Sequence, residues 1–401
     1  MAVAPESNRP PRRKKKGLIV LGVILGLILA LGIGGCAYVA SIGKAWDDGT
    51  DKFQSQVFPN EDGTLSDPNN ANDGKNANGD NGEDANGKNK DVPAALQNGE
   101  ITKDKGEKKV TPEDQNGNGI PDKVENGKVT KRPEETGSTD ILLLGSDSRA
   151  GSAEAVNVQG QRADSIMILH IPNNGGDPYL ISVMRDTWVN IPGHGSAKVN
   201  HGLDYGGVGL QVSTLEQLLN VRIDHVAEID FTGFKSMTDA LGGVDVNVPI
   251  SFKSDHYEYT QGQMHMDGAQ ALEFVRQRYA FEDGDYQRVR NQRAFMDGVL
   301  HTIQSKGAFN NATNFKNVVE SIAPYVTVDS GLDSGEMAQL ATPYIAKGGA
   351  HLHKLTLPNA GTGWSADGQS IVILDSEATS QLSDALRNNT MSDYTAKYGE
   401  D

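Results

Sequence analysis

Asp140-Ile-Leu-Leu-Leu-Gly145 is the stretch that decides the fold, because its unbroken apolar run predicts a buried strand. Ser165-Ile-Met-Ile-Leu-His-Ile171 is a second run of this kind, and Pro172 ends it. Tyr179-Leu-Ile-Ser-Val-Met184 is a third. These three runs predict the core strands of a globular domain that begins near residue 138.

Helical and strand patterns alternate after these runs, and this alternation predicts an α/β layered domain. No linker pattern follows Ser305, so the chain beyond it is expected to complete the same domain. The predicted helices cover residues 209–220, 231–241, 314–322, 334–345 and 377–387, and the predicted strands cover residues 226–230, 244–248 and 351–357.

Composition excludes some classes of protein. The chain of 401 residues carries a formal net charge of −16, which argues against general nucleic-acid binding. Its length suits two or three domains, while its 46 glycines and low apolar content predict that part of it does not pack. The single cysteine, Cys36, excludes internal disulfides and any cysteine-based zinc site.

The amino-terminal segment has the pattern of a membrane anchor. Residues 1–16 end in a basic cluster, and residues 17–43 carry no charged side chain. Such a run exceeds the roughly 20 residues that cross a bilayer, and the basic cluster predicts a cytoplasmic amino terminus. The chain is therefore expected in the cell membrane as a single-pass protein with its bulk outside the cytoplasm. The alternative is lipidation of Cys36, since Ile33-Gly-Gly-Cys36 has the look of a lipoprotein cleavage site.

Residues 44–137 are predicted to be a low-complexity extracytoplasmic linker, because Asn, Gly, Asp and Lys alternate without apolar periodicity. Within it, residues 114–125 match D-x-[DN]-x-[DN]-G-x5-E, the spacing of a calcium-binding loop. A chance match is the alternative, because the segment is so rich in Asp, Asn and Gly. The possible Ca²⁺ ligands are Asp114, Asn116, Asn118, Asp122 and Glu125.

Charged side chains stand at the ends of the predicted strands. Asp147 follows the first strand, Asp164 precedes the second, and Arg162 and Arg185 lie at ends of the second and third. Ligands of α/β sheets usually bind at strand ends. Two carboxylates with several arginines suit a magnesium-bound polyphosphate. The alternative is that the two aspartates only cap or turn the chain.

The segments Ala271–Tyr279 and Gly284–Phe295 together hold five arginines and no lysine. Arginine without lysine suits forked recognition of a phosphate or a carboxylate. If the second segment is helical, Arg288 and Gln292 share a face, since they are four residues apart. The alternative is a solvated helix with scattered surface charge.

Six segments resemble the LytR-CpsA-Psr family and occur in that family's order. They are Leu144-Gly-Ser-Asp-Ser-Arg149, Arg162-Ala-Asp-Ser165, Val183-Met-Arg-Asp-Thr187, Lys198-Val-Asn200, residues 234–249 with Leu241-Gly-Gly-Val-Asp245, and residues 271–295. A basic tail and a single membrane span are also typical of that family. The resemblance implies a layered α-β-α domain with a central mixed sheet at residues 138–391, followed by a tail at 392–401. It also implies an apolar tunnel for an isoprenoid chain.

The resemblance further implies a membrane-anchored phosphotransferase. Such proteins move a glycopolymer (teichoic acid, capsule or other wall polysaccharide) from a polyprenyl pyrophosphate carrier to peptidoglycan, and hydrolyse the pyrophosphate when the acceptor is missing. By motif, Asp147 and Asp164 would hold Mg²⁺, Lys198 would lie near the lipid-side phosphate, and Asp285 is a candidate base for the acceptor hydroxyl. The pyrophosphate oxygens would be clamped by Arg162, Arg185, Arg276, Arg278, Arg288 and Gln292.

One motif departs from the family's pattern. The family usually reads Arg-x-x-Arg-Gln-Gln where this chain has Arg288-Val-Arg-Asn-Gln-Arg293, so Asn291 replaces an arginine. Arg290 and Arg293 are the residues that could take over the phosphate contact of that arginine.

Two alternatives to a transferase come from other classes of protein. They are a non-catalytic regulator that binds polyprenyl phosphate and a calcium-stiffened surface adhesion protein.

Overall fold

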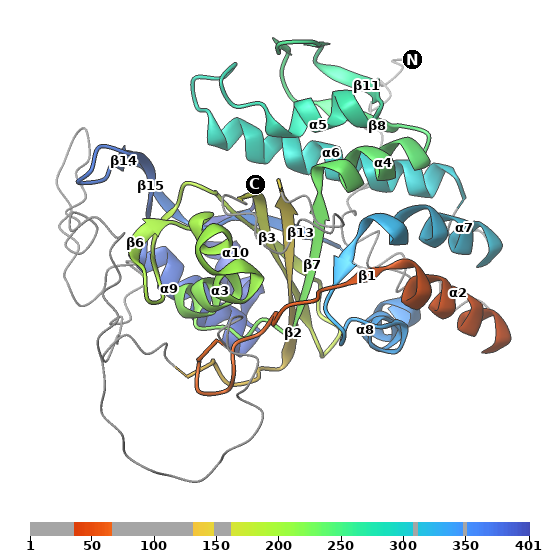
Figure 1. The fold of residues 1–401 in the computed structure, drawn as a ribbon, viewed down its shortest axis with the longest axis horizontal. Coiled ribbons are helices and arrows are strands. Elements are labelled where there is room, and N and C mark those ends of the chain that lie inside the picture. Colours follow the sequence, from red (N-terminus) through yellow and green to blue (C-terminus); the bar gives the residue numbers. More distant parts are fainter. Residues whose placement is uncertain (1–35, 66–130, 148–161, 308–311, 348–350) are drawn as a thin grey trace, which may run out of the picture.

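A seven-stranded mixed sheet lies at the centre of the protein (Figure 1). The computed structural model describes residues 36–65, 131–147, 162–307, 312–347 and 351–401. Three neighbouring pairs of strands run parallel and three run antiparallel. In spatial order the strands are β1 (Asp51–Lys52), β12 (Thr327–Val328), β7 (His225–Asp230), β2 (Ser138–Ser146), β3 (Ala163–Pro172), β4 (Tyr179–Val183) and β13 (His353–Thr356).

Helices cover both faces of this sheet because alternate strand residues point to opposite sides. Ile141 and Met167 lie in one hydrophobic core, and Leu142 and Ile168 lie in the other. The first core is covered by α2 (Cys36–Gly49), α4 (Phe231–Ala240), α5 (Gly268–Arg276), α6 (Asp285–Ser305), α7 (Ala312–Ile322) and α8 (Ser334–Lys347). The second is covered by α3 (His201–Leu219), α9 (Ser376–Asn388) and α10 (Met391–Tyr398). The layered α-β-α architecture with a central mixed sheet is confirmed.

Four small antiparallel sheets and one 3₁₀ turn complete the described elements. The strand predicted at residues 244–248 forms, but it pairs with β11 beside α6 and not with the central sheet. The pairs are β8 (Val244–Val248) with β11 (Gly262–Met266), β9 (Phe252–Lys253) with β10 (Glu258–Tyr259), β5 (Trp188–Ile191) with β6 (Gly195–Lys198), and β14 (Asn359–Trp364) with β15 (Ser370–Leu374). The 3₁₀ turn η3 spans Ala323–Tyr325.

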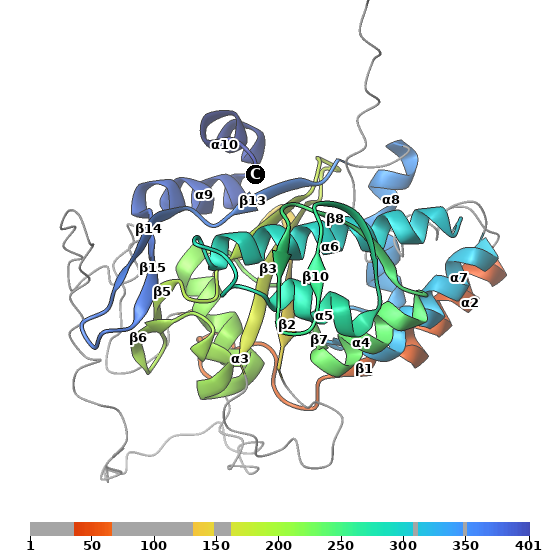
Figure 2. The ribbon, with the colours of Figure 1, turned by 90° about the horizontal axis from the view of Figure 1, so that it is seen from above.

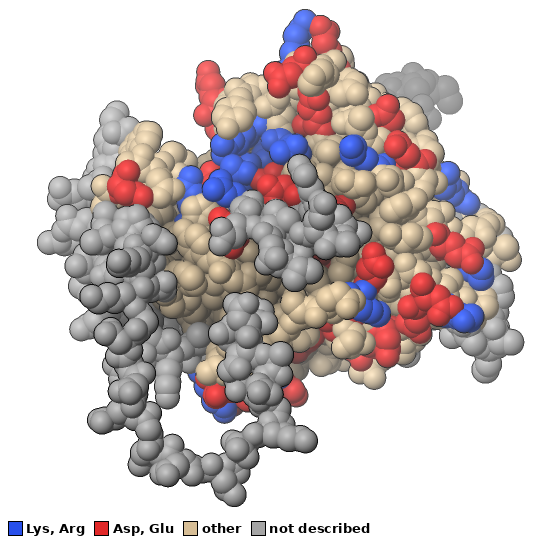
Figure 3. Space-filling model, viewed as in Figure 1, with Lys and Arg blue, Asp and Glu red and all other residues tan. Residues whose placement is uncertain are grey.

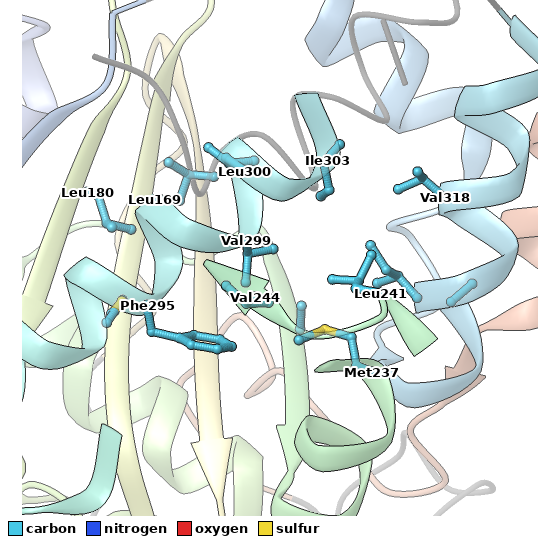
Figure 4. Packing of buried hydrophobic residues seen from close by; sticks show 14 of the residues in the cluster. Leu169, Leu180, Met237, Leu241, Val244, Phe295, Val299, Leu300, Ile303 and Val318 are labelled. Carbon is cyan, nitrogen blue, oxygen red and sulfur yellow. The ribbon is translucent and has the colours of Figure 1, made fainter. Parts of the chain in front are cut away.

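Helix α6 carries the arginine-rich segment and is fixed by close packing. Phe295 and Val299 of α6 pack in the first core with Met237 of α4 (Figure 4). Behind the helix, a Cβ placed on Gly298 would come within 2.6 Å of the backbone oxygen of Asp245 in β8. Only glycine allows this approach of helix to strand. The position of α6 is therefore set from both sides.

The first part of the predicted linker packs in the domain, which corrects part of the prediction. The ring of Trp46 is only 3% exposed, and its Nε1 donates to the backbone oxygen of Leu332 at 3.1 Å. Ile42 is also buried, and α2 lies against α7 and α8 at one end of the sheet (Figure 2). Residues 36–43 of the predicted span thus begin α2, and residues 44–65 are not linker.

Of the predicted span, residues 17–35 lie outside the described residues, as does the predicted calcium loop at 114–125. In the part of the chain that the structure describes, no helix has the length and apolar character needed to cross a membrane.

The chain on either side of the segment 66–130 is joined by a backbone hydrogen bond. The backbone N–H of Arg132 donates to the backbone oxygen of Glu61 at 3.3 Å. The side chain of Arg132 is buried, and its NH2 group lies 2.6 Å from Oε1 of Glu216 in α3. The domain therefore begins before residue 137, contrary to the predicted boundary.

The predicted tail at 392–401 also belongs to the fold. Tyr394 of α10 is buried in the second core, and the backbone N–H of Asp401 donates to the oxygen of Lys354 in β13 at 3.1 Å. The buried Arg293 pairs with Asp401 at 2.7 Å.

The burial of Trp46 makes a prediction about stability. Trp46→Ala removes an indole from the first core and leaves the Leu332 carbonyl without its donor. We expect the free energy of unfolding to fall by about 3–5 kcal/mol, measured by chemical denaturation. Lys44→Ala, on the exposed side of the same helix, is the control and should leave the midpoint unchanged. Equal midpoints for Trp46→Ala and the unmodified chain would mean that α2 does not pack as described.

Candidate functional site

Asp164 lies at the end of the central sheet where β3 begins and β4 ends. Because the two strands are antiparallel, with Ile166 opposite Val183, the start of one and the end of the other lie side by side. This register brings the carboxylate of Asp164 into an ion pair with the guanidinium of Arg185. Its other oxygen lies 3.4 Å from Nε of Arg276, at the carboxyl end of α5. Three segments distant in the sequence therefore meet at one carboxylate.

Asp186 is a second centre of the same cluster. Its carboxylate lies 3.4 Å from Nζ of Lys198, 3.2 Å from NH1 of Arg278 and 3.6 Å from Nε of Arg185. This residue was not predicted from the sequence. The signal available was its place beside Arg185 in the segment 183–187. Nothing in the sequence shows that Lys198 and Arg278 converge on it.

The first turn of α6 supplies the third part of the cluster. Asp285 lies 2.9 Å from NH2 of Arg288 and 3.8 Å from NH1 of Arg278, so Arg278 bridges two carboxylates. Burial raises the pKa of Asp285, although the charge of Arg288 opposes this effect. Burial likewise lowers the pKa of Arg288, which is 2% exposed. The buried Nε of Arg288 has no hydrogen-bond partner, whereas its NH2 group pairs with Oδ2 of Asp285.

The remaining predicted residues lie around this cluster. Nε2 of Gln292 donates to the backbone oxygen of Asp164 at 3.3 Å, so it positions that residue. Asp147 is exposed at the end of β2, the strand next to β3, and accepts the backbone N–H of Arg162 at 2.6 Å. Arg162 is also exposed. The two predicted magnesium ligands thus lie at the same edge of the sheet.

The arginines near the departure from the family pattern do not join the cluster. Arg290 pairs with Asp283 and also donates to Gln287 on the same helix. Arg293 donates to Thr356 at 2.8 Å, on the far edge strand β13. Neither arginine therefore takes part in the ion pairs around Asp164, Asp186 and Asp285, and a phosphate contact by one of them stays a prediction. The buried amide of Asn291 accepts from Gln287 at 2.8 Å.

An apolar cavity of about 220 Å³ meets the charged cluster. Asp164, Arg276 and Gln292 belong to both, and the guanidinium of Arg276 lies over the ring of Phe231, 4.1 Å from its centroid. The other lining residues come mainly from β2, β3, β7 and the helices of the first core. They are Trp46, Leu143, Leu144, Gly145, Ser165, Met167, Ala227, Glu228, Ile229, Phe231, Phe234, Met237, Leu272, Val275, Phe295, Met296, Val299, Ile322 and Val326.

The charges of the cluster leave it positive. Five cationic side chains, at positions 185, 198, 276, 278 and 288, face three carboxylates, at 164, 186 and 285, which leaves two positive charges in excess. In Figure 3, basic side chains gather with acidic ones in a patch near the position of α5 and α6 in Figure 1. Forked, partly buried guanidinium groups bind phosphate oxygens well. The arrangement suits a ligand with an anionic head and an apolar chain.

Two curated proteins are similar to this chain in sequence. A transferase of Enterococcus faecalis, named polyisoprenyl-teichoic acid–peptidoglycan teichoic acid transferase TagU, is 31% identical over 250 residues, covering 62% of this chain and 78% of the relative. The protein of the same name from Bacillus cereus is 36% identical over 206 residues, covering 51% of this chain and 64% of the relative.

Solved structures share the fold. The protein gbs0355 of Streptococcus agalactiae superposes with a TM-score of 0.52 at 22% identity, covering 63% of this chain and 88% of that one. The LytR-Csp2A-Psr enzyme of Actinomyces oris gives a TM-score of 0.51 at 22% identity, covering 64% and 93%. The model of the LytR_cpsA_psr family matches residues 96–388, well over half of the sequence, and the chain belongs to this family.

Proposed function

We propose that this protein transfers a glycopolymer from a polyprenyl pyrophosphate carrier to peptidoglycan. The observation that carries the proposal is the junction of a positive cluster with an apolar cavity at Asp164, Arg276 and Gln292. A polyprenyl pyrophosphate has the matching chemistry, since its pyrophosphate is anionic and its chain is apolar. The curated relatives are named as teichoic acid transferases that act on peptidoglycan, which supports the same class of substrate.

The transfer is an attack by an acceptor hydroxyl on the phosphorus that carries the glycopolymer. A new phosphodiester bond forms to the acceptor oxygen. The bond from that phosphorus to the bridging oxygen breaks, and polyprenyl phosphate leaves with the electron pair of that bond. Asp285 accepts the hydroxyl proton, for which its raised pKa suits it. Arg185, Arg276 and Arg288 neutralise the charge that develops on the phosphate oxygens.

Asp147 and Asp164 fit a magnesium ion that is bound together with substrate. Mg²⁺ usually takes one or two carboxylates and fills its shell with phosphate oxygens and water. Asp147 and Asp164 are two such carboxylates at one sheet edge, and the exposed Asp147 is open to an ion. When bound, Mg²⁺ would polarise the pyrophosphate oxygens. Hydrolysis of the pyrophosphate follows from the same geometry, with water in place of the acceptor hydroxyl.

A membrane anchor before α2, in the remaining part of the predicted span at residues 17–35, belongs to the proposal as well. It places the amino terminus in the cytoplasm and the domain on the outer side of the membrane, where polyprenyl carrier and peptidoglycan meet. Ca²⁺ binding at residues 114–125 stays a prediction.

The transfer is tested by comparing two arginines of equal exposure. The side chains of Arg276 and Arg290 are each 48% exposed, yet only Arg276 contacts Asp164 and the cavity. We expect Arg276→Ala to lower kcat/KM about 10²–10³-fold with a polyprenyl pyrophosphate-linked oligosaccharide and a peptidoglycan fragment, because phosphate charge is left uncompensated. Arg290→Ala should stay within about twofold.

The assay follows polyprenyl phosphate release and coupled acceptor, with and without Mg²⁺. Binding of the carrier without release of product by the unmodified protein would favour the non-catalytic regulator. Equal turnover of Arg276→Ala and Arg290→Ala would contradict the assignment of the site.

The base is tested by the pH dependence of turnover. Asp285 works as a base only when deprotonated, and burial raises its pKa above the ordinary aspartate value. Turnover should therefore fall as the pH falls through this raised value. Asp285→Asn should lose this acidic limb and about 10²–10⁴-fold in kcat. Asp283→Asn, at an exposed carboxylate two residues earlier, should keep both. An unchanged acidic limb in Asp285→Asn would assign the proton to another group.

The cavity is tested by filling it. Val299 lines it from α6, and Val299→Phe adds volume where the isoprenoid chain would lie. We expect kcat/KM for long-chain carriers to fall about tenfold relative to carriers with one or two isoprene units. Leu300→Met is the control, since Leu300 is buried beside Val299 but does not line the cavity. An equal loss for both carrier lengths would show general damage to packing.

A further inference from the structure

A second group of metal-ligating side chains lies away from the proposed active site. Nitrogen or oxygen atoms of His351, His353 and Glu400 lie within 4.8 Å of one another, and no other group of three His, Cys, Asp or Glu of this kind occurs in the described residues. Leu352 is 3% exposed, so the alternation of an extended chain turns the two flanking histidines to the same, outer side. The function proposed above does not use these residues.

Acidic groups on both sides orient the inner histidine. Nδ1 of His353 lies 2.7 Å from Oε1 of Glu400, and its Nε2 lies 3.8 Å from Oδ2 of Asp177. The ring stacks on Tyr179, with centroids 4.6 Å apart and planes 15° apart. Asp177 also accepts the backbone N–H of His351 at 3.2 Å. Glu400 is thus placed to share a metal with His353, while Asp177 lies near the opposite ring nitrogen but beyond hydrogen-bond distance.

We propose that His351, His353 and Glu400 form a binding site for a divalent transition metal ion such as Zn²⁺. Two imidazoles and a carboxylate are ligands that Zn²⁺ takes, with water in the fourth position. Asp177, whose Oδ2 lies 3.8 Å from the other imidazole nitrogen of His353, adds a further negative charge beside the site. Two other exposed histidines, His256 and His265, each pair with one carboxylate, as His265 does with Asp245 at 2.8 Å, and neither belongs to a group of three metal-ligating side chains in the described residues.

The bound ion joins two parts of the fold. His353 begins the edge strand β13, whereas Glu400 lies in the segment after α10. The next residue, Asp401, already donates its backbone N–H to Lys354 in β13 and pairs with Arg293 of α6. Arg293 stands next to Gln292 in α6, and Gln292 contacts Asp164. By holding Glu400, the ion also holds the segment whose Asp401 pairs with Arg293, and so it supports α6 from the side of β13.

The test uses the full chain, purified without a polyhistidine tag and titrated with ZnCl₂ by calorimetry. We expect one equivalent of Zn²⁺ to bind, with no competition from Mg²⁺, which prefers oxygen ligands. His351→Gln and Glu400→Gln should each weaken binding at least about tenfold, because each removes one of three ligands. His265→Gln should bind as the unmodified chain does.

Two further measurements separate this site from loose surface binding. In the unmodified chain, Zn²⁺ at about a hundredfold excess over Kd should raise Tm by about 5 °C and slow amide hydrogen exchange in residues 391–401. His351→Gln should show neither effect while keeping the metal-free Tm, since His351 is exposed. Several equivalents bound, or equal binding by His351→Gln and His265→Gln, would overturn the proposal.

Discussion

The ion pairs of Asp164 are the contacts on which the arrangement of the site depends. This carboxylate belongs to the sheet, yet its partners Arg185 and Arg276 come from the end of β4 and the end of α5. Without it, the guanidinium groups would face one another in a partly buried space, where like charges are poorly screened. The register of the strands therefore decides where these charges lie. The positions of the charges, in turn, decide where the helices contact the sheet.

The cluster is incompletely neutralised, and this imbalance serves binding. Buried ion pairs contribute little net stability, because desolvation offsets their attraction. The buried Nε of Arg288, which has no hydrogen-bond partner, adds to that cost. The anionic head group of the proposed substrate would offset the excess positive charge of the cluster. Arg276 joins this polar chemistry to the apolar cavity, since its guanidinium contacts Asp164 and covers Phe231.

Elements with strong periodicity could be predicted from the sequence, whereas those held by distant contacts could not. The stretches at residues 141–145 and 166–169 are apolar throughout because helices cover both faces of β2 and β3. Trp46 stands beside a polar, glycine-rich segment, and its partner Leu332 is 286 residues away. Asp186 was missed for the same reason, because its role arises from the meeting of three chain segments.

The departure at Asn291 shows another limit of sequence patterns. Spacing along α6 shows which residues share a face, but not which neighbour that face meets. Arg293 therefore looked like a substitute for a phosphate ligand, while the fold directs it to β13 and the segment after α10.

The contact between Arg132 and Glu61 changes the architecture in which the proposed anchor operates. Glu61 and Arg132 belong to the two described parts of the chain that flank residues 66–130, and this hydrogen bond places those two parts side by side in the domain. In the proposed membrane-anchored arrangement, α2 would join the anchor to the domain. Because Trp46 of α2 also lines the cavity, the packing of this helix would set the distance between the cavity and the bilayer.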